Sequence, residues 1–80
     1  MRTIVYGGHT IQVKTLGTEK IHYDGQLVSS KNSWSGATHI FSVKENAENV
    51  QYEVEIRSRA LGLGDYVIVR RNGIIIFSDR

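Results

Sequence analysis

The chain has 80 residues, with ten basic and eight acidic side chains, no cysteine and no proline. This length predicts one domain over residues 1–80, and the absence of cysteine excludes disulfide bonds and thiolate metal sites as sources of stability. The formal net charge of +2 is too small to indicate a nucleic-acid partner by itself.

The first half of the chain predicts two β-hairpins, because apolar and polar residues alternate around turn-forming dipeptides. The first hairpin surrounds Gly7-Gly8, and the second surrounds Asp24-Gly25. The side chains that share one face of the first hairpin are Ile4, Tyr6, Ile11 and Val13. The corresponding side chains of the second hairpin are Ile21, Tyr23 and Val28.

A third hairpin is predicted over residues 38–58, with a four-residue loop from Glu45 to Glu48. Its register sets Phe41 opposite Tyr52. The second strand of this hairpin has the most regular alternation in the chain, which is typical of a strand with one buried face and one face in water. The residues that we expect to find in the core are Phe41, Tyr52, Val54 and Ile56.

The last hairpin, "DYVIVRRNGIIIFS" over residues 65–78, turns at Asn72-Gly73, a pair that tolerates the positive φ angles of a type I′ turn. Counting outward from the turn pairs Arg71 with Ile74 and continues without interruption along both strands. Both faces of this hairpin are then apolar. One face carries Val67, Val69, Ile74 and Ile76, and the other carries Tyr66, Ile68, Ile75 and Phe77.

Short strands at about ten-residue spacing predict an all-β protein, an antiparallel β-sandwich or open barrel of about eight short strands joined mainly by hairpins. No helical period and no internal repeat is evident. The second apolar face of the last hairpin is covered either by another layer of the chain or by another molecule. The interface hypothesis is a homodimer, or docking onto a parent protein, through Ile68, Ile75 and Phe77.

The sequence favours neither a metal site nor catalysis. A metal site shared by the three histidines is disfavoured, because His22 faces outward whereas His9 and His39 face inward in the predicted register. Serines are plentiful, but none lies at the strand-to-helix turn that exposes a catalytic serine. We therefore expect no metal, no cofactor and no enzymatic activity, and hydrolysis at the Ser/His-rich loop is the least supported interpretation.

The loop after the second hairpin contains the only tryptophan, Trp34, between Ser33 and Ser35 and close to Lys31. An aromatic side chain beside hydroxyl groups is typical of a recognition surface, because it offers a large contact area at a small entropy cost. The alternative is that Trp34 folds back and caps an open end of the sandwich.

The C-terminal arginines indicate a second kind of binding. Arg70 and Arg71, with Arg57 and Arg59, form a cluster if their strands are neighbours, and such a cluster suits single-stranded nucleic acid or another polyanion. No interleaved aromatic pattern accompanies them, and four glutamates of the neighbouring hairpin oppose phosphate. We therefore expect a non-catalytic binding or assembly module that acts through protein–protein contacts, above all self-association, with polyanion binding as the alternative.

The sequence shows no signal for a membrane. No apolar run approaches the ~20 residues of a membrane-spanning helix, and the N-terminus lacks the apolar core of a signal peptide. The absence of cysteine fits a reducing compartment. We expect a soluble, cytoplasmic protein.

The chain from Ile21 onward resembles small bacterial all-β domains of uncharacterised function, in which a "DG…VSxKxSxxGxxHxF" segment precedes a "YEVxI" strand and a closing "RxNGxxIxSD" hairpin. It is also similar to the β-sandwich domains of the Fas apoptosis inhibitory molecule, whose strands alternate with Asp-Gly and Asn-Gly turns. The first resemblance implies no particular activity. The second implies a β-sandwich and nothing about function.

Overall fold

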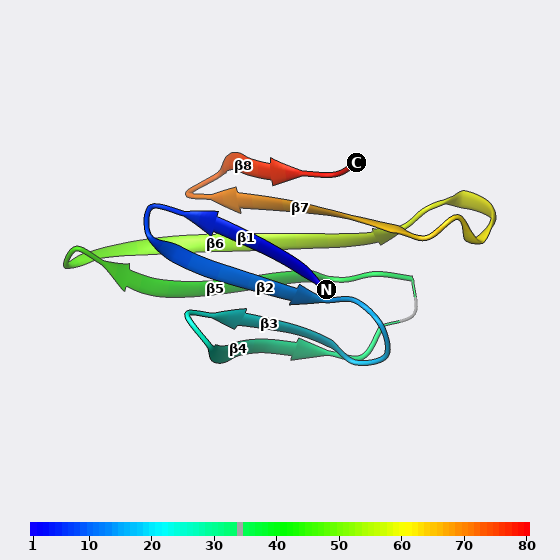
Figure 1. Ribbon diagram of the computed structural model, residues 1–80, viewed down its shortest axis with the longest axis horizontal. Coiled ribbons are helices and arrows are strands. Elements are labelled where there is room, and N and C mark those ends of the chain that lie inside the picture. The colour runs from blue at the N-terminus through cyan, green and yellow to red at the C-terminus, as the bar shows by residue number, and fades with distance from the viewer. Residues whose placement is uncertain (34) are drawn as a thin grey trace.

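Two stacked β-sheets make up the fold. The computed structural model describes residues 1–33 and 35–80, and in these residues the chain forms eight strands in two four-stranded antiparallel sheets. The first sheet contains, in spatial order, β1 (Arg2–Tyr6), β2 (His9–Lys14), β3 (Glu19–Tyr23) and β4 (Gln26–Lys31). The second contains β5 (Thr38–Glu45), β6 (Glu48–Ser58), β7 (Asp65–Arg71) and β8 (Ile74–Ser78). Neither sheet closes into a barrel (Figure 1), so the predicted all-β sandwich is confirmed.

The loop between β6 and β7 contains a 3-10 turn, η1 (Ala60–Gly62). It is the only helical element among the described residues, which therefore include no helix long and apolar enough to cross a membrane. The backbone of Leu61 within this turn has a positive φ of 60°, and its side chain is 94 % exposed. The segment between β6 and β7 thus makes a turn at one end of the sandwich.

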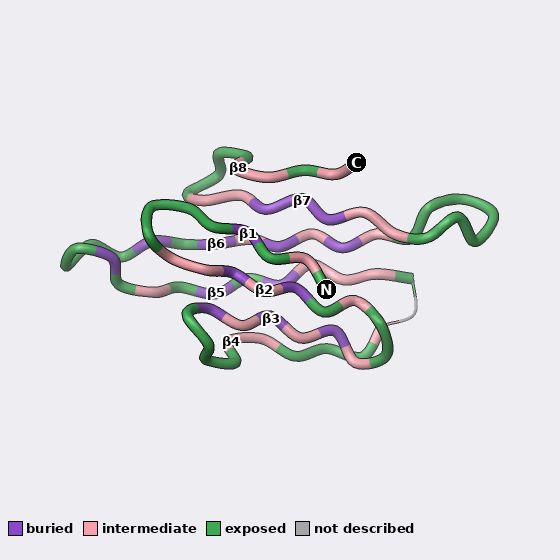
Figure 2. The backbone as a smooth tube through the Cα atoms, in the orientation of Figure 1, coloured by how far each residue is buried: buried purple, intermediate pink, exposed green. Residues whose placement is uncertain are grey.

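The core lies between the two sheets. Figure 2 shows buried segments within β2, β3, β6 and β7, whereas the turns at both ends of the molecule are exposed. The rings of Phe41 and Tyr52 stack with their centroids 5.3 Å apart, and the ring of Tyr23 from the other sheet packs against both. All the residues predicted for the core are buried, namely Phe41, Tyr52, Val54 and Ile56.

The third hairpin has the predicted register, with Phe41 opposite Tyr52, but its loop is shorter than predicted. Glu45 pairs with Glu48, so that positions 46–47 alone form the turn, and both have positive φ. The prediction of a four-residue loop is wrong because a two-residue turn of this kind matches the twist of the strands and lets one more pair of residues join the sheet. The additional pair brings Glu45 onto the inward face, where it is buried.

A β-bulge in β8 changes the register of the last hairpin. The two pairs next to the turn are as predicted, but Val69 then faces Phe77, because Ile76 is an extra residue in β8. A shift of one residue moves a side chain to the other face of a sheet. Phe77 therefore packs against the core, and its predicted grouping with Ile68 and Ile75 on one face is wrong.

The two sheets repeat one arrangement, although no repeat is evident in the sequence. In both sheets the last strand carries its extra residue at the third position after the turn. The first residue of the turn before this strand also makes the same kind of contact in both sheets, because its side-chain oxygen accepts a backbone N–H from an earlier strand. Asp24 accepts the N–H of Thr10 at 2.8 Å, and Asn72 accepts the N–H of Gln51 at 2.9 Å. The similarity resides in strand pairing and turn chemistry and not in the sequence.

The connection between the two sheets runs against the end of β6. The carbonyl of Ala37 accepts the N–H of Ile56 at 2.9 Å. Gly36 has a φ of +107°, and a Cβ atom on it would lie 2.2 Å from the carbonyl oxygen of Ile56. Both its backbone angle and the lack of space therefore require glycine at this position.

We predict that Gly36→Ala destabilises the protein more than Gly73→Ala does, although both glycines have positive φ. Gly73 has a φ of +84° in open space, so alanine there costs only backbone strain, about 1–2 kcal/mol. Alanine at Gly36 also displaces the backbone of β6, and we expect at least twice that cost. Urea unfolding of the two variants measures the difference, and equal losses would contradict the close approach of the connection to β6.

Candidate functional site

The structure separates the three residues of the predicted interface. Ile68 is only 4 % exposed, Phe77 is half-buried against the core, and Ile75 is 54 % exposed. Ile68 lies on the outer face of the sheet, next to Arg70 and opposite Glu55. Arg70 and Glu55 form an ion pair at 2.9 Å. The aliphatic parts of long charged side chains cover apolar neighbours in this way. The three residues do not form the expected continuous exposed strip, and Ile75 is the one that stays accessible.

Exposed apolar side chains remain where β1 and β8 form edges of the two sheets. Within the described residues, β1 ends the first sheet and β8 ends the second. Figure 1 shows both strands on the same side of the molecule, running in opposite directions, with β8 lying beyond β1. Val5 and Ile74 are each 70 % exposed, and Ile75 is nearly as accessible. Both edges therefore combine unpaired backbone groups with apolar side chains.

The arginines predicted to bind polyanions face carboxylates. Arg70 Nη1 lies 2.8 Å from Glu53 Oε2 and 2.9 Å from Glu55 Oε1. Arg71 Nη2 lies 2.8 Å from Glu45 Oε1. These ion pairs balance the positive charge of both guanidinium groups locally.

The other two arginines of the predicted cluster lie toward the η1 end of β6 and β7. Arg57 Nε lies 3.6 Å from a carboxylate oxygen of Glu55. The guanidinium of Arg59 lies over the ring of Tyr66, 5.6 Å from its centroid, and donates to the carbonyl of Asp79 at 2.7 Å. The four arginines therefore do not form a basic groove with free guanidinium groups.

The predicted recognition loop lies at the end of the sandwich where the chain passes from one sheet to the other. Lys31 Nζ donates to the first carbonyl of β5 at 2.7 Å, and Ser33 Oγ donates to the carbonyl of Gly36 at 2.6 Å. Ser35 is exposed. Trp34 lies outside the described residues. The Arg70 and Arg71 pair lies near the opposite end of the molecule, by the β7–β8 turn (Figure 1).

Glu45 is the centre of a buried polar cluster that joins the two sheets. The carboxylate is 7 % exposed, and its Oε2 accepts hydrogen bonds from the hydroxyls of Tyr23 in β3 and Tyr52 in β6. Its Oε1 accepts hydrogen bonds from Arg71, whose guanidinium lies 5.4 Å from the centroid of the Tyr6 ring. Four strands of both sheets thus send a polar or aromatic group to one carboxylate or to its arginine partner.

These contacts change the acidities of the cluster. Burial by itself raises the pKa of Glu45, but hydrogen bonds from Tyr23, Tyr52 and Arg71 outweigh it and lower the pKa to about 2. Burial and the hydrogen bond to Glu45 raise the pKa of Tyr52 to about 12. The same two causes raise the pKa of Tyr23. The folded state therefore holds an ionised carboxylate against neutral phenols.

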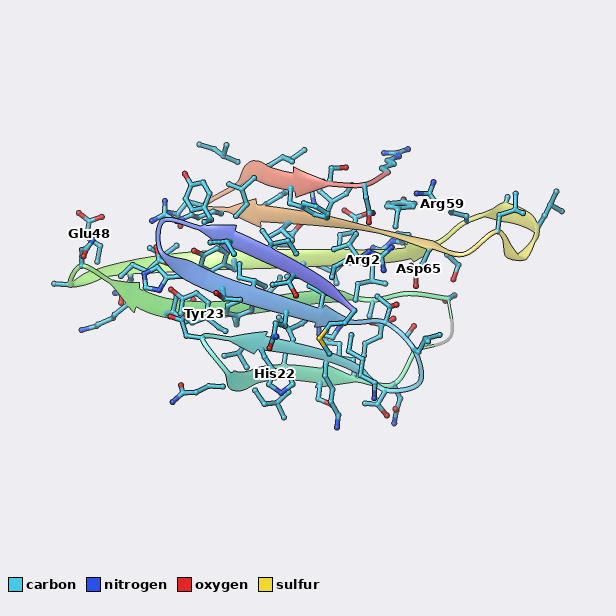
Figure 3. All side chains as sticks on the ribbon, viewed as in Figure 1. Arg2, His22, Tyr23, Glu48, Arg59 and Asp65 are labelled. Carbon is cyan, nitrogen blue, oxygen red and sulfur yellow. The ribbon has the colours of Figure 1, made fainter. Side chains whose placement is uncertain are left out.

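Arg2 connects the first sheet to the second at the other end of β1. Its Nε lies 2.7 Å from Asp79 Oδ2, and its Nη2 lies 2.8 Å from Asp65 Oδ1. Figure 3 shows the side chains of Arg2 and Asp65 close together at the start of β7. Burial by itself raises the pKa of Asp79, but the N–H of Val67 and the Arg2 guanidinium outweigh it and hold the pKa below its ordinary value. These ion pairs link strands that the chain order places far apart.

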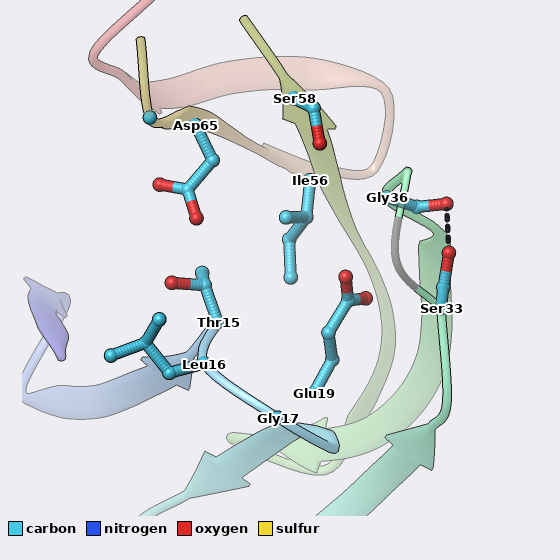
Figure 4. Close-up of a pocket in the computed structure, with 10 residues that line it drawn as sticks. Thr15, Leu16, Gly17, Glu19, Ser33, Gly36, Ile56, Ser58 and Asp65 are labelled. Carbon is cyan, nitrogen blue, oxygen red and sulfur yellow. Dashed lines mark hydrogen bonds between the residues drawn. The ribbon is translucent and has the colours of Figure 1, made fainter. Parts of the chain in front are cut away.

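A pocket of about 300 Å³ opens at the end of the sandwich that contains the connection (Figure 4). Both sheets contribute to its walls, since Glu19 begins β3 whereas Ser58 ends β6 and Asp65 begins β7. The hydroxyl-bearing residues Thr15 and Ser33 also line it. Figure 4 shows the carboxyl groups of Glu19 and Asp65 directed into the same space.

A buried histidine orients the pocket carboxylate. His39 Nε2 lies 2.9 Å from Glu19 Oε1, and His39 Nδ1 lies 2.7 Å from Ser29 Oγ. The order serine, histidine, carboxylate is that of a hydrolase triad, in which the imidazole transfers protons to and from the substrate. The His39 side chain has no exposed surface, so no substrate atom reaches its ring. The arrangement is therefore suited to holding Glu19 in one orientation.

The three histidines make separate contacts. His9 Nδ1 lies 2.7 Å from Asp24 Oδ2, and the His9 ring stacks on Tyr23. His39 belongs to the contact with Glu19 described above, and His22 lies on the outer face of the first sheet, opposite Leu27. No group of three or more metal-ligating side chains is present in residues 1–33 and 35–80.

The sequence predictions did not include Glu19, Glu45 or Arg2 among the functional residues. Glu19 precedes Ile21 by two positions and Glu45 follows Val43 by two, so the period of each strand already places both carboxylates on an inward face. A charge at an inward position is the signal that identifies them, because such a charge requires a buried partner. For Arg2 the partners come from the other end of the chain, and no local pattern indicates them.

A scan against protein-family models finds no match, and no curated protein and no solved structure matches the chain significantly.

We predict that acid unfolds the protein through the protonation of Glu45. The folded pKa of Glu45, about 2, lies below the ordinary 4.5. The contribution of the ionised carboxylate to the free energy of unfolding is therefore complete above pH 4.5 and is lost as the pH falls toward 2. The full contribution is about 3 kcal/mol. Urea unfolding of wild type and Glu45→Gln between these pH values measures it, and we expect Glu45→Gln to be less stable at pH 7 and less dependent on pH.

The control for this prediction is Glu53→Gln, which changes a carboxylate on the outer face of the same sheet. Glu53 is paired with Arg70, but its side chain is 34 % exposed. We expect this variant to keep the pH dependence of the wild type. An unchanged acid dependence in Glu45→Gln would show that Glu45 does not carry it.

Proposed function

We propose that the protein is a non-catalytic assembly module that binds a second copy of itself along the side where β1 and β8 lie. The observation that carries the proposal is the position of two free strand edges, one from each sheet, on one side of the molecule. A free edge binds another strand through its backbone N–H and C=O groups.

The two edges are complementary to the same edges of a second copy. β1 and β8 run in opposite directions, and β8 lies beyond β1 (Figure 1). A two-fold axis parallel to the strands brings β1 of one copy beside β8 of the other in antiparallel orientation, and the second pair follows by symmetry. Each four-stranded sheet then continues into a sheet of the other copy, which removes both edges on this side.

The side chains along these edges favour association. Val5, Ile74 and Ile75 are exposed in one copy, and their burial between two copies is a favourable hydrophobic contribution. Edge strands that avoid pairing commonly carry proline or outward-pointing lysine, and β1 and β8 contain neither. The only charged residue within the two strands is Arg2, which is already paired with Asp65 and Asp79.

Polyanion binding receives less support than assembly. A phosphate group would have to displace Glu53 and Glu55 from Arg70, and Glu45 from Arg71. Each displacement leaves a carboxylate beside the incoming anion, which opposes binding. The proposed module is cytoplasmic, and the support for this location is the absence of cysteine.

We predict that the wild-type protein is a dimer in solution and that Ile75→Lys makes it a monomer. Light scattering should give twice the 9.0 kDa of the chain for the wild type and a single chain mass for the variant. Because Ile75 is more than half exposed in one copy, lysine at this position should leave the β-rich circular dichroism spectrum unchanged.

Ile40→Lys is the matched control. Ile40 is the same residue type in β5, an edge strand on the opposite side of the sandwich, and it is 56 % exposed. This variant should remain dimeric. A wild-type protein that is monomeric at the highest concentration reached, or a dimer that Ile40→Lys dissociates and Ile75→Lys does not, would contradict the proposed surface.

A further inference from the structure

The end pocket presents hydrogen-bond acceptors from three sides. Glu19 and Asp65 place carboxylates in the space of about 300 Å³, and Ser33 adds a hydroxyl oxygen (Figure 4). Ser33 lines the pocket, and its hydroxyl hydrogen is already donated to the carbonyl of Gly36 at 2.6 Å, so that its oxygen is left with acceptor capacity only. None of the described residues that line the pocket is basic. A ligand that fits this chemistry is therefore a donor of hydrogen bonds.

Glu19 is a group that can accept a hydrogen bond from such a donor. It is 2 % exposed, and among the described residues only His39 donates a hydrogen bond to its carboxylate, at Oε1. A buried carboxylate has lone pairs for about four hydrogen bonds and is costly when they are unmet. His39 is itself held by Ser29, so the carboxylate is kept in one orientation toward the pocket.

The second carboxylate of the pocket differs from Glu19. Asp65 Oδ1 lies 2.8 Å from Arg2 Nη2, and its side chain is 28 % exposed. Arg2 therefore holds Asp65 through an ion pair, whereas His39 contacts one oxygen of Glu19 and the other oxygen, Oε2, remains for a ligand. A hydrogen-bond donor placed next to this second oxygen of Glu19 competes with neither His39 nor Arg2.

We propose that the end pocket binds a primary ammonium group carried on a small aliphatic or hydroxylated molecule. The three N–H donors of the ammonium match Glu19 and two of the three hydroxyl oxygens that line the pocket, those of Ser33, Thr15 and Ser58. Ile56 lines the same pocket and offers an apolar contact for the carbon atoms of the ligand. The volume lies at the lower end of the range for small-molecule sites, so the ligand is small.

The test compares ethanolammonium with ethylene glycol, a neutral molecule of nearly the same shape, in NMR titrations of the isotope-labelled protein. Ethanolammonium should cause saturable shifts of the backbone amides of Gly17, Gly36 and Gly64, which line the pocket. Ethylene glycol and an equal concentration of sodium chloride should not. The absence of saturable shifts with ethanolammonium, or equal affinity for ethylene glycol, would overturn the proposal.

Variants locate the binding to Glu19. A hydrogen bond between charged groups contributes about 1.5–3 kcal/mol, so Glu19→Gln should weaken ethanolammonium binding about tenfold or more. The matched control is Glu48→Gln, an exposed carboxylate at the turn on the opposite end of the molecule (Figure 3), which should bind as the wild type does. If a folded Glu19→Gln protein binds unchanged, the proposal is wrong. Ser33→Ala, at a half-buried loop residue, provides a second test and should weaken binding severalfold.

Discussion

The buried carboxylate of Glu45 links the two sheets. Hydrogen bonds from Tyr23 in the first sheet and Tyr52 in the second converge on one of its oxygens, and Arg71 balances its charge. A chain of 80 residues without cysteine has a small core and no disulfide to offset an unpaired buried charge. The cluster therefore favours one relative position of the sheets, because sliding of one sheet over the other breaks the hydrogen bond from Tyr23 to the buried carboxylate. Arg71 is also poorly placed to bind a ligand, because removing it from Glu45 would leave a buried charge unbalanced.

Much of the fold could be predicted from the sequence because its turns and its alternation are local signals. Dipeptides such as Asp24-Gly25 and Asn72-Gly73 define the hairpins, and the period of two defines the core around Phe41. The bulges could not be predicted in this way. The extra residue in β8 is Ile76, which lies among other apolar residues, so an uninterrupted register and a shifted one fit the pattern of side chains equally well. Only the packing of Phe77 against the other sheet distinguishes them.

The candidate sites were less predictable than the fold because their partners are distant in the chain. Glu19 is fixed by His39 from the other sheet, and Arg2 meets Asp79 at the far end of the sequence. The period of two places these charged residues inward but does not say which residues compensate them. The two free strand edges could be predicted only in part. The sequence indicated an association surface at the last hairpin, whereas the relation of β8 to β1 follows from how the sheets stack (Figure 1).

The most direct test of this account is the pKa of Glu45 in the folded protein, measured by NMR from the carboxyl carbon during an acid titration. A carboxylate that joins the two sheets through Tyr23, Tyr52 and Arg71 should titrate at about 2. The free energy of that shift is the additional stability that ionisation of Glu45 gives the folded state. A midpoint near the ordinary value of 4.5 would show that the cluster does not hold the sheets together.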